Sequence, residues 1–495
     1  MSPLLRFLYS LKEKLLGKKQ QQKPPKAPKN NTVEESSITL LKDERSSKAQ
    51  ARAPYFVQIG FDFGTSYSKC VCRDMMMNKA WVHIPARSED EANPFLIPSA
   101  LSMEDGRISS VNNSQIHYPE NGLYHLKNAL VKVALAKWDD PVLKYYGSVL
   151  KASDMDQLSE QIESCAVYLL AGALGDVRAA VRRRYPGFGE VPQDYMAVNM
   201  AVPVEDAEQP SVKELYKRII RAGWAIADQL AGYPKIDITE STLLKKEYLR
   251  SNEQYFDDAC YIYPEVSANV QGFVRSRVSS PGMYLFSDAG GGSVDQSIFI
   301  FSRQNSEDYL TYLAAQVLPL GSSHIERLAA EEAGNVDWKS LDLWRSRKEQ
   351  GKKRVELLTA KEWISKKLER GTEKTLALAK AKLFVKEQLD GIKVIFGGGG
   401  HCEYPYKNSV MKPFSGQLFR KTISPDVIGL PVPSDLELKG RATRWMRRLT
   451  VAYGLSFEKG ELARFTFPID VSDPRPEEIW QPRTGMHQAP SKDEC

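Results

Sequence analysis

The strongest constraint on the fold of this chain is a motif that occurs twice, 226 residues apart. In the first copy a strand-like apolar run ends at Asp62, and a short turn leads into a second strand-like run, "YFVQIGFDFGTSYSKCVCRD". In the second copy the same features surround Asp288, in "MYLFSDAGGGSVDQSIFIFS". Two such strand–turn–strand units predict two related lobes that face one another, each with an acidic residue at a strand end.

Both turns contain residue types that suit phosphate binding. Glycine permits the backbone angles of a tight turn, and successive N–H groups in such a turn form an anion-binding concavity. An aspartate becomes useful there if a hydrated Mg²⁺ lies between it and the phosphate, because Mg²⁺ prefers carboxylate and water oxygens. The candidate residues are Asp62, Gly64, Thr65 and Ser66 in the first turn, and Asp288, Gly290, Gly291, Gly292 and Ser293 in the second.

Several other site classes are excluded by the same residues. The letters D-F-G at 62–64 do not indicate a protein kinase, because no glycine-rich loop precedes them and no H-R-D occurs in the sequence. The phosphate motif G-x-x-x-x-G-K-[ST] is absent, and no G-x-G-x-x-G has a dinucleotide-binding context. The six cysteines show no C-x-x-C pair, which disfavours a zinc site and favours reduced thiols in the cytoplasm.

Strand-like and helix-like patterns alternate from about residue 55 onward. We expect buried strands at 195–204 and 391–397, and helices at 156–184, 212–230, 337–389 and 441–457. Alternation on this scale predicts an α/β protein with mixed sheets.

Six segments in a fixed order make the chain similar to a known family. "FDFGTSYS" and "DAGGGSVD" resemble the family's I-D-L-G-T-T-Y-S and D-L-G-G-G-T-F-D, and "AVPVED", "YPEVSANVQGF", "FGGGGH" and "VAYGLSF" resemble its V-P-A, E-P-T-A-A, V-G-G-S and A-Y-G segments. The chain thus resembles the actin-like ATPase superfamily, and most closely the nucleotide-binding region of the seventy-kilodalton heat-shock chaperones. The resemblance covers residues 56–457 and implies a duplicated actin-like (ribonuclease-H-like) fold with two lobes around a nucleotide cleft.

The resemblance also implies roles for individual residues. Asp62 and Asp288 would hold the water ligands of Mg²⁺, Tyr67 would join Thr65 and Ser66 at the phosphates, and Ser293 would reach the terminal phosphate of ATP. The catalytic residues implied are Lys127 in "LYHLKNALVK", which would position the attacking water, together with Glu265 and Asp295 near the water and the metal.

A third glycine cluster, at 397–400, corresponds to the family's adenosine segment. Gly397 and Gly398 would let the backbone approach a flat base or ribose closely. His401 stands where the family has an arginine that stacks on the base. After "LPLG" this chain reads "SSHIE", where the family has Gly-Glu, so the segment 322–390 departs from the family pattern.

Charge separates a basic N-terminal segment from a nearly neutral body. Residues 1–55 hold 12 basic and 5 acidic residues, a net +7, so the remaining 440 residues carry −1 of the total of +6. We therefore expect no nucleic-acid partner for the body. The expected organisation is a basic tail over 1–54 with an amphipathic helix at 3–19 that contacts a membrane surface or a partner, lobe I over 55–275, lobe II over 276–460, and a C-terminal tail over 461–495.

The leading functional hypothesis is a cytoplasmic, chaperone-like ATPase that binds Mg-ATP, hydrolyses it slowly and acts as a switch on a protein partner. It would lack a peptide-binding domain, because only 38 residues follow Phe457. Three alternatives remain open: an actin-like filament, a small-molecule kinase of the same fold, and a scaffold that holds ADP or ATP without turnover. The site inferred above is common to all of them.

Overall fold

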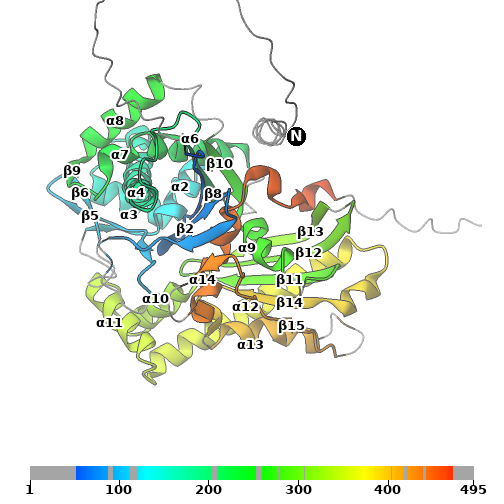
Figure 1. The fold of residues 1–495 in the computed structure, drawn as a ribbon. Coiled ribbons are helices and arrows are strands. Elements are labelled where there is room, and N and C mark those ends of the chain that lie inside the picture. Colours follow the sequence, from blue (N-terminus) through cyan, green and yellow to red (C-terminus); the bar gives the residue numbers. More distant parts are fainter. Residues whose placement is uncertain are drawn as a thin grey trace, which may run out of the picture.

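The computed structural model describes residues 52–471 apart from residues 87, 89–92, 112–120, 203–208, 252–258, 277–278, 306, 403, 417–418, 420–421 and 439–441. Helices pack around two large sheets, which agrees with the α/β class expected from the sequence (Figure 1). The expected amphipathic helix at 3–19 lies outside the described residues.

The first sheet has the strand order β10-β8-β1-β2-β3-β16. Its central strand β1 runs antiparallel to β2 and parallel to β8, and all seven of its residues are buried. A strand that is covered on both faces needs such a continuous apolar run. The strands are β1 (Phe56–Asp62), β2 (Tyr67–Asp74), β3 (Lys79–Val82), β8 (Tyr195–Val202), β10 (Cys260–Pro264) and β16 (Leu436–Glu437), with β4 (Ile97–Pro98) beside β2.

The second sheet repeats this arrangement with the order β15-β14-β11-β12-β13-β17. Its strand β11 is antiparallel to β12 and parallel to β14, as β1 is to β2 and β8. The two sheets therefore share both strand order and strand direction around their central strands. The strands are β11 (Gly282–Ala289), β12 (Val294–Gln304), β13 (Glu307–Leu318), β14 (Lys393–Gly397), β15 (Val427–Ile428) and β17 (Arg464–Thr466).

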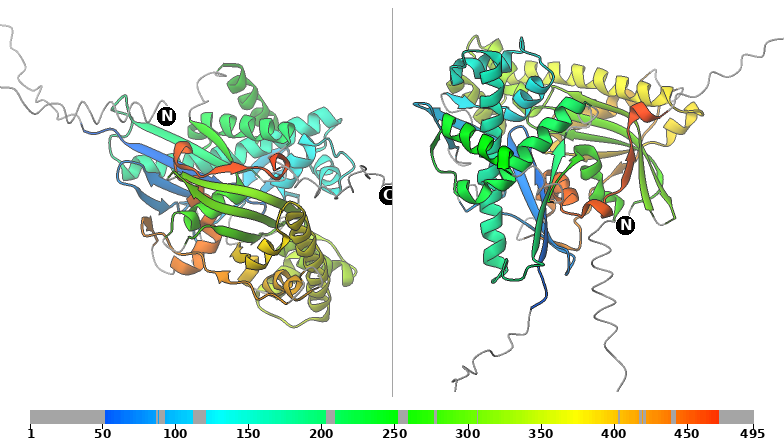
Figure 2. Two further views of the ribbon diagram at one scale, coloured as in Figure 1. Left: turned by 90° about the vertical axis from the view of Figure 1, so that its right-hand side faces the viewer. Right: turned by 90° about the horizontal axis from the view of Figure 1, so that it is seen from above.

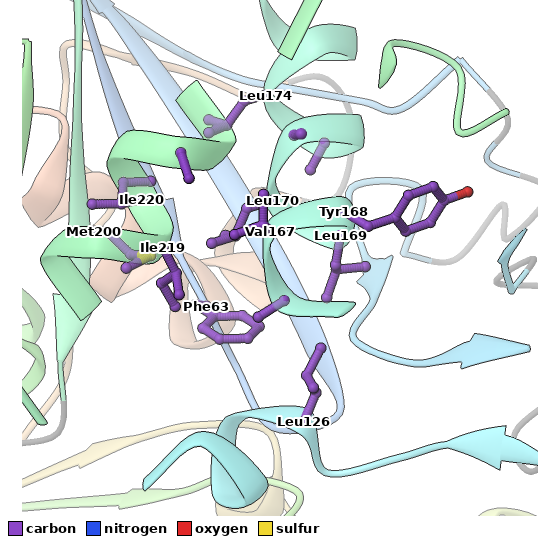
Figure 3. Packing of buried hydrophobic residues seen from close by; sticks show 14 of the residues in the cluster. Phe63, Leu126, Val167, Tyr168, Leu169, Leu170, Leu174, Met200, Ile219 and Ile220 are labelled. Carbon is purple, nitrogen blue, oxygen red and sulfur yellow. The ribbon is translucent and has the colours of Figure 1, made fainter. Parts of the chain in front are cut away.

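Helix α4 (Met155–Arg184) forms the centre of the first lobe's core together with α6 (Pro210–Ala225). Leu170 and Leu174 on α4 meet Ile219 and Ile220 on α6, and Phe63 reaches the same cluster from the end of β1 (Figure 3). Among the described residues, α4 is the one helix long and apolar enough to cross a bilayer, but 78% of its apolar window is buried inside the protein. This burial is that of a core helix.

Helix α12 (Val355–Ala381) packs against the second sheet, and two shorter helices precede it in the chain (Figures 1 and 2). Polar groups fix its position on the sheet, because Gln296 donates to Thr372 (2.8 Å) and Thr375 donates to Gln316 (2.8 Å). The other two are α10 (Ser322–Glu332) and α11 (Trp338–Glu349).

Helices α9 (Glu265–Val274) and α14 (Ala442–Leu455) connect the two sheets. A side chain at Gly60 would overlap the backbone of Ala452, and one at Gly454 would overlap Ala268, so α14 packs in backbone contact with both β1 and α9. Although α14 falls within the stretch expected to form lobe II, it and β16 therefore return to the first sheet. At the other boundary, β17 adds a strand to the second sheet from within the expected C-terminal tail.

Smaller elements complete the described fold. A sheet of order β7-β5-β6-β9 lies at the edge of the first lobe. Its strands are β5 (Leu101–Glu104), β6 (Arg107–Ser110), β7 (Gly122–Leu123) and β9 (Ile236–Asp237), and the remaining helices are α2 (Leu126–Ala134), α3 (Pro141–Leu150), α7 (Ala227–Leu230), α8 (Ile238–Ser251) and α13 (Tyr406–Met411), with short 3-10 turns at Lys386–Gly391, Gly400–Cys402, Lys412–Ser415, Lys459–Glu461 and Pro468–Asp470.

Candidate functional site

The first turn joins β1 to β2 and places Asp62 opposite Lys69. The antiparallel register pairs these two residues, and Lys69 Nζ lies 2.8 Å from Asp62 Oδ2. The neighbouring Phe63 is fully buried in the first lobe's core, which anchors the turn. Asp62 is only 2% exposed, and its Oδ1 has no hydrogen-bond partner among the described residues.

The second turn joins β11 to β12 and places two carboxyl groups opposite one another. Asp288 pairs in register with Asp295, and like charges at directly opposed positions repel. Burial, and next the negative charge of Glu265, raise the pKa of Asp288 to about 7. The same two causes raise the pKa of Asp295 well above its ordinary value. Both carboxyl groups are thus held in an environment that disfavours their charge.

An amide, rather than a cation, contacts Asp288. Asn269 on α9 donates from Nδ2 to Asp288 Oδ2 over 2.8 Å. The hydroxyl of Thr450 on α14 donates to Asn269 Oδ1, which leaves the NH₂ group of Asn269 turned toward Asp288. This contact links the connecting helices α9 and α14 to the second turn.

The two turns touch one another at their tips. A methyl group at Gly292 would lie 2.6 Å from Thr65 Cγ2, and one at Gly291 would overlap Ser66 Oγ. Only glycine leaves room for so close an approach of the two backbones. The structure therefore brings together the two sets of predicted phosphate-binding residues, which come from opposite lobes.

A buried ion pair lies beside these turns. Lys127, on α2, places its Nζ 2.6 Å from Oε2 of Glu265, the first residue of α9. Burial disfavours the charge of Lys127, but Glu265 and then Tyr216, Asp295 and Asp62 raise its pKa above the ordinary value, so the ammonium persists. The three predicted catalytic residues, Lys127, Glu265 and Asp295, thus share one cluster with Asp62 and Asp288.

The charges of this cluster do not balance. Four carboxyl groups (Asp62, Glu265, Asp288 and Asp295) interact with two ammonium groups (Lys69 and Lys127), a net −2 when all are ionised. Excess negative charge in an enclosed site calls for a cation or for retained protons.

The cluster fits a hydrated Mg²⁺ better than a directly ligated ion. Among the described residues no group of three or more His, Cys, Asp or Glu side chains is arranged to hold a metal directly. Mg²⁺ characteristically keeps several waters and uses one or two carboxylates. The unpartnered Oδ1 atoms of Asp62 and Asp295 are suitable acceptors for such waters.

The third glycine cluster lies against the second turn. Side chains at Gly397 or Gly398 would crowd the Asp288 carboxyl group, and Gly398 has a φ of +74°. His401 points elsewhere. It is 4% exposed, its Nε2 lies 3.2 Å from Ser287 Oγ, and its ring packs against Phe396. Burial lowers the pKa of His401 to about 3, and so deep a ring has no face open to a base.

Two arginines near this cluster were not expected from the sequence. Arg448, on α14, lies within 3.1–3.2 Å of the position that a Gly399 side chain would take. Its guanidinium has no hydrogen bond or ion pair within the described part of the chain. Burial raises the pKa of Tyr67, and the positive charge of Arg345, on α11, opposes this rise. Nothing in the spacing of either residue distinguishes it from other arginines of charged helices.

A separate cavity of about 170 Å³ lies in the first lobe. Residues from β4, the end of β6 and α4 line it, among them Ile97, Val111 and Asp176. None of the predicted site residues belongs to its lining. The four cysteines among the described residues, Cys70, Cys72, Cys165 and Cys260, are free and buried, in keeping with the expected reduced thiols.

Comparison with known proteins adds no family to this description. No protein-family model matches the chain, and no curated protein matches it significantly.

Proposed function

We propose that this protein binds Mg-ATP between its two lobes and hydrolyses it slowly, as a chaperone-like ATPase that controls a protein partner. One observation carries the proposal. Two glycine turns from opposite lobes contact one another, and four carboxyl groups and two lysines cluster beside them. The backbone N–H groups of the two turns are suitable donors for phosphate oxygens. The excess negative charge of the carboxyl groups favours the Mg²⁺ that accompanies ATP.

The proposal includes an actin-like assignment of the fold. The common strand order of the two sheets, with corresponding turns β1–β2 and β11–β12, supports a duplicated unit. In open α/β sheets a ligand characteristically binds in the crevice outside the carboxyl ends of the strands. The motif order read from the sequence favours the chaperone branch of the superfamily.

Lys127 and Glu265 are the residues that would orient the attacking water. Lys127 donates to Glu265, and the remaining N–H groups of the ammonium and the remaining acceptor sites of the carboxylate would hold a water by both its oxygen and one hydrogen. Asp295 offers a further acceptor through its unpartnered Oδ1. Lys127 is 6% exposed, which fixes its side chain and limits competition from bulk water.

The remaining predicted residues would bind the phosphates and the base. Backbone N–H groups and hydroxyls of Thr65, Ser66 and Ser293 are the donors for phosphate oxygens. Mg²⁺, held through waters by Asp62 and Asp288, would neutralise charge on the phosphates. We assign the base contact to Arg448 in place of the expected His401, because an unpaired guanidinium on Gly399 can stack on a purine.

The proposal is tested by nucleotide binding and turnover in Asp62→Asn and Asp288→Asn. Both variants are expected to lose at least about 100-fold in ATP turnover, because each removes a carboxylate that holds the metal. Phosphate release and calorimetric ATP titration with Mg²⁺ measure the two steps separately.

The matched control is Asp139→Asn, because the Asp139 side chain is fully exposed. It should retain wild-type turnover. If Asp62→Asn and Asp288→Asn also retained wild-type turnover, the proposed function would be wrong.

A further inference from the structure

Helix α11 contacts the elements that hold both glycine turns. It belongs to the segment that departs from the family pattern, and no role for it follows from the motifs. Arg345 and Lys348 lie three residues apart on α11 and therefore on one face of the helix. Their contacts lead to different turns.

Arg345 leads to the first turn. Its Nε donates to Glu349 Oε1 over 2.9 Å, which holds the guanidinium near Tyr67, where its positive charge opposes the rise in the Tyr67 pKa. Tyr67 begins β2, directly after Thr65 and Ser66. The Arg345 side chain is 15% exposed, so water competes only weakly for its contacts.

Lys348 leads to the second turn through the start of α10. Its Nζ donates to the carbonyl of Ser322 (2.9 Å) and to Glu326 Oε2 (2.8 Å), both in enclosed surroundings. The N–H of Ser322 donates to Gly290 O (3.0 Å), and the N–H of Ser323 donates to Gly291 O (2.9 Å). The position of α11 is thereby coupled to the backbone of the turn that carries Gly290 and Gly291.

The other side of the α11–α12 pair faces solvent. Leu343 on α11 and Val355 and Leu358 on α12 are 48%, 73% and 50% exposed. Lys352, Lys353 and Arg354, between the two helices, are exposed as well. A molecule bound to this apolar and basic surface would contact α11 directly.

We propose that α11 is a positioning element that sets how tightly the two turns hold nucleotide, with Arg345 acting on the first turn and Lys348 on the second. The inference rests on the proposed function and specifies how that site is regulated.

The test compares Arg345→Gln and Arg345→Lys with Arg347→Gln, a control that removes a charge from the same helix. Release of fluorescently labelled ADP is expected to be about tenfold faster in Arg345→Gln, as for the loss of one charged contact of about 1.4 kcal/mol. Single-turnover hydrolysis of bound ATP should change less than about twofold. Arg345→Lys should recover part of the retention, and Arg347→Gln should match the wild type.

A double-mutant cycle with Tyr67→Phe separates a direct link from a general loss of structure. If Arg345 acts through the Tyr67 hydroxyl, Arg345→Gln adds little in the Tyr67→Phe background. Additive effects, or unchanged release in Arg345→Gln, would overturn the inference.

Hydrogen exchange without nucleotide makes the result independent of the proposed function. Faster exchange at 64–67 and 290–293 in Arg345→Gln, but not in Arg347→Gln, is expected if α11 holds the turns. If the wild type bound no nucleotide, the proposed function would fail, while the exchange data would still decide whether α11 holds the turns.

Discussion

The two glycine turns share a sequence pattern and a strand geometry, yet their aspartates lie in opposite electrostatic surroundings. Asp62 faces the ammonium of Lys69 across its hairpin, whereas Asp288 faces the carboxyl group of Asp295. The polar partner of Asp62 therefore comes from the opposite strand, whereas the partner of Asp288, Asn269, comes from helix α9. A repeated motif predicts a repeated backbone, while the residue that lies opposite its aspartate, seven positions further along, differs between the two copies.

The first test of this difference between the two turns is Lys69→Met, for which we expect a large loss of stability. Asp62 would be left buried without its cation, so the variant should lose about 3 kcal/mol in free energy of unfolding. Urea denaturation at pH 7.5 measures this loss.

Lys79→Met is the control for this variant, because Lys79 is exposed on β3 and should be within about 0.5 kcal/mol of the wild type. Adding Asp62→Asn to Lys69→Met should recover most of the loss. A Lys69→Met variant as stable as the control would mean that Asp62 does not depend on its lysine.

An effect of opposite sign and similar size is expected for Asp288→Asn. The pKa of Asp288 is about 7 in the folded chain and about 4 when unfolded. The folded state therefore binds the extra proton between these values, and the wild type loses stability as the pH rises from 4 to 7. Asp288→Asn lacks this loss, so its advantage over the wild type should be about 4 kcal/mol larger at pH 8 than at pH 4.

Denaturation curves at the two pH values measure this difference, and Asp139→Asn supplies a carboxyl-to-amide control at an exposed site. An advantage of Asp288→Asn that did not grow with pH would contradict the raised pKa. Added Mg²⁺ should reduce the advantage, since a cation stabilises the ionised carboxyl group that the variant lacks.

The smallest effect tests how Asn269 recognises Asp288. Thr450→Val removes the hydroxyl that fixes the Asn269 amide, so it should cost about 1 kcal/mol in stability. Thr359→Val, at an exposed position of α12, is the control for the loss of a hydroxyl. Equal stability of the two variants would show that the orientation of Asn269 has another cause.

The sequence was informative where chemistry depends on neighbours along the chain. The α/β class, the long helix ending at Arg184 and both glycine turns follow from local pattern. Lys69 could also have been paired with Asp62, because a tight hairpin fixes the cross-strand register.

The sequence was uninformative where tertiary packing selects the residue. Arg448 and Asn269 come from helices that no spacing rule connects to the turns. His401 was expected at the base, but a short 3-10 turn directs its ring toward Ser287 and Phe396. The return of α14 to β1 was equally invisible, since a helix period does not say which sheet the helix will cover.

The return of α14 has a consequence for dividing the protein. A fragment that stops before residue 442 would expose the surface of β1 that Ala452 covers. A fragment that starts at 276 would contain α14 without the strand on which this helix packs. We therefore expect that neither half folds on its own. When the two fragments are mixed, we expect them to associate through the packing of α14 on β1 and α9.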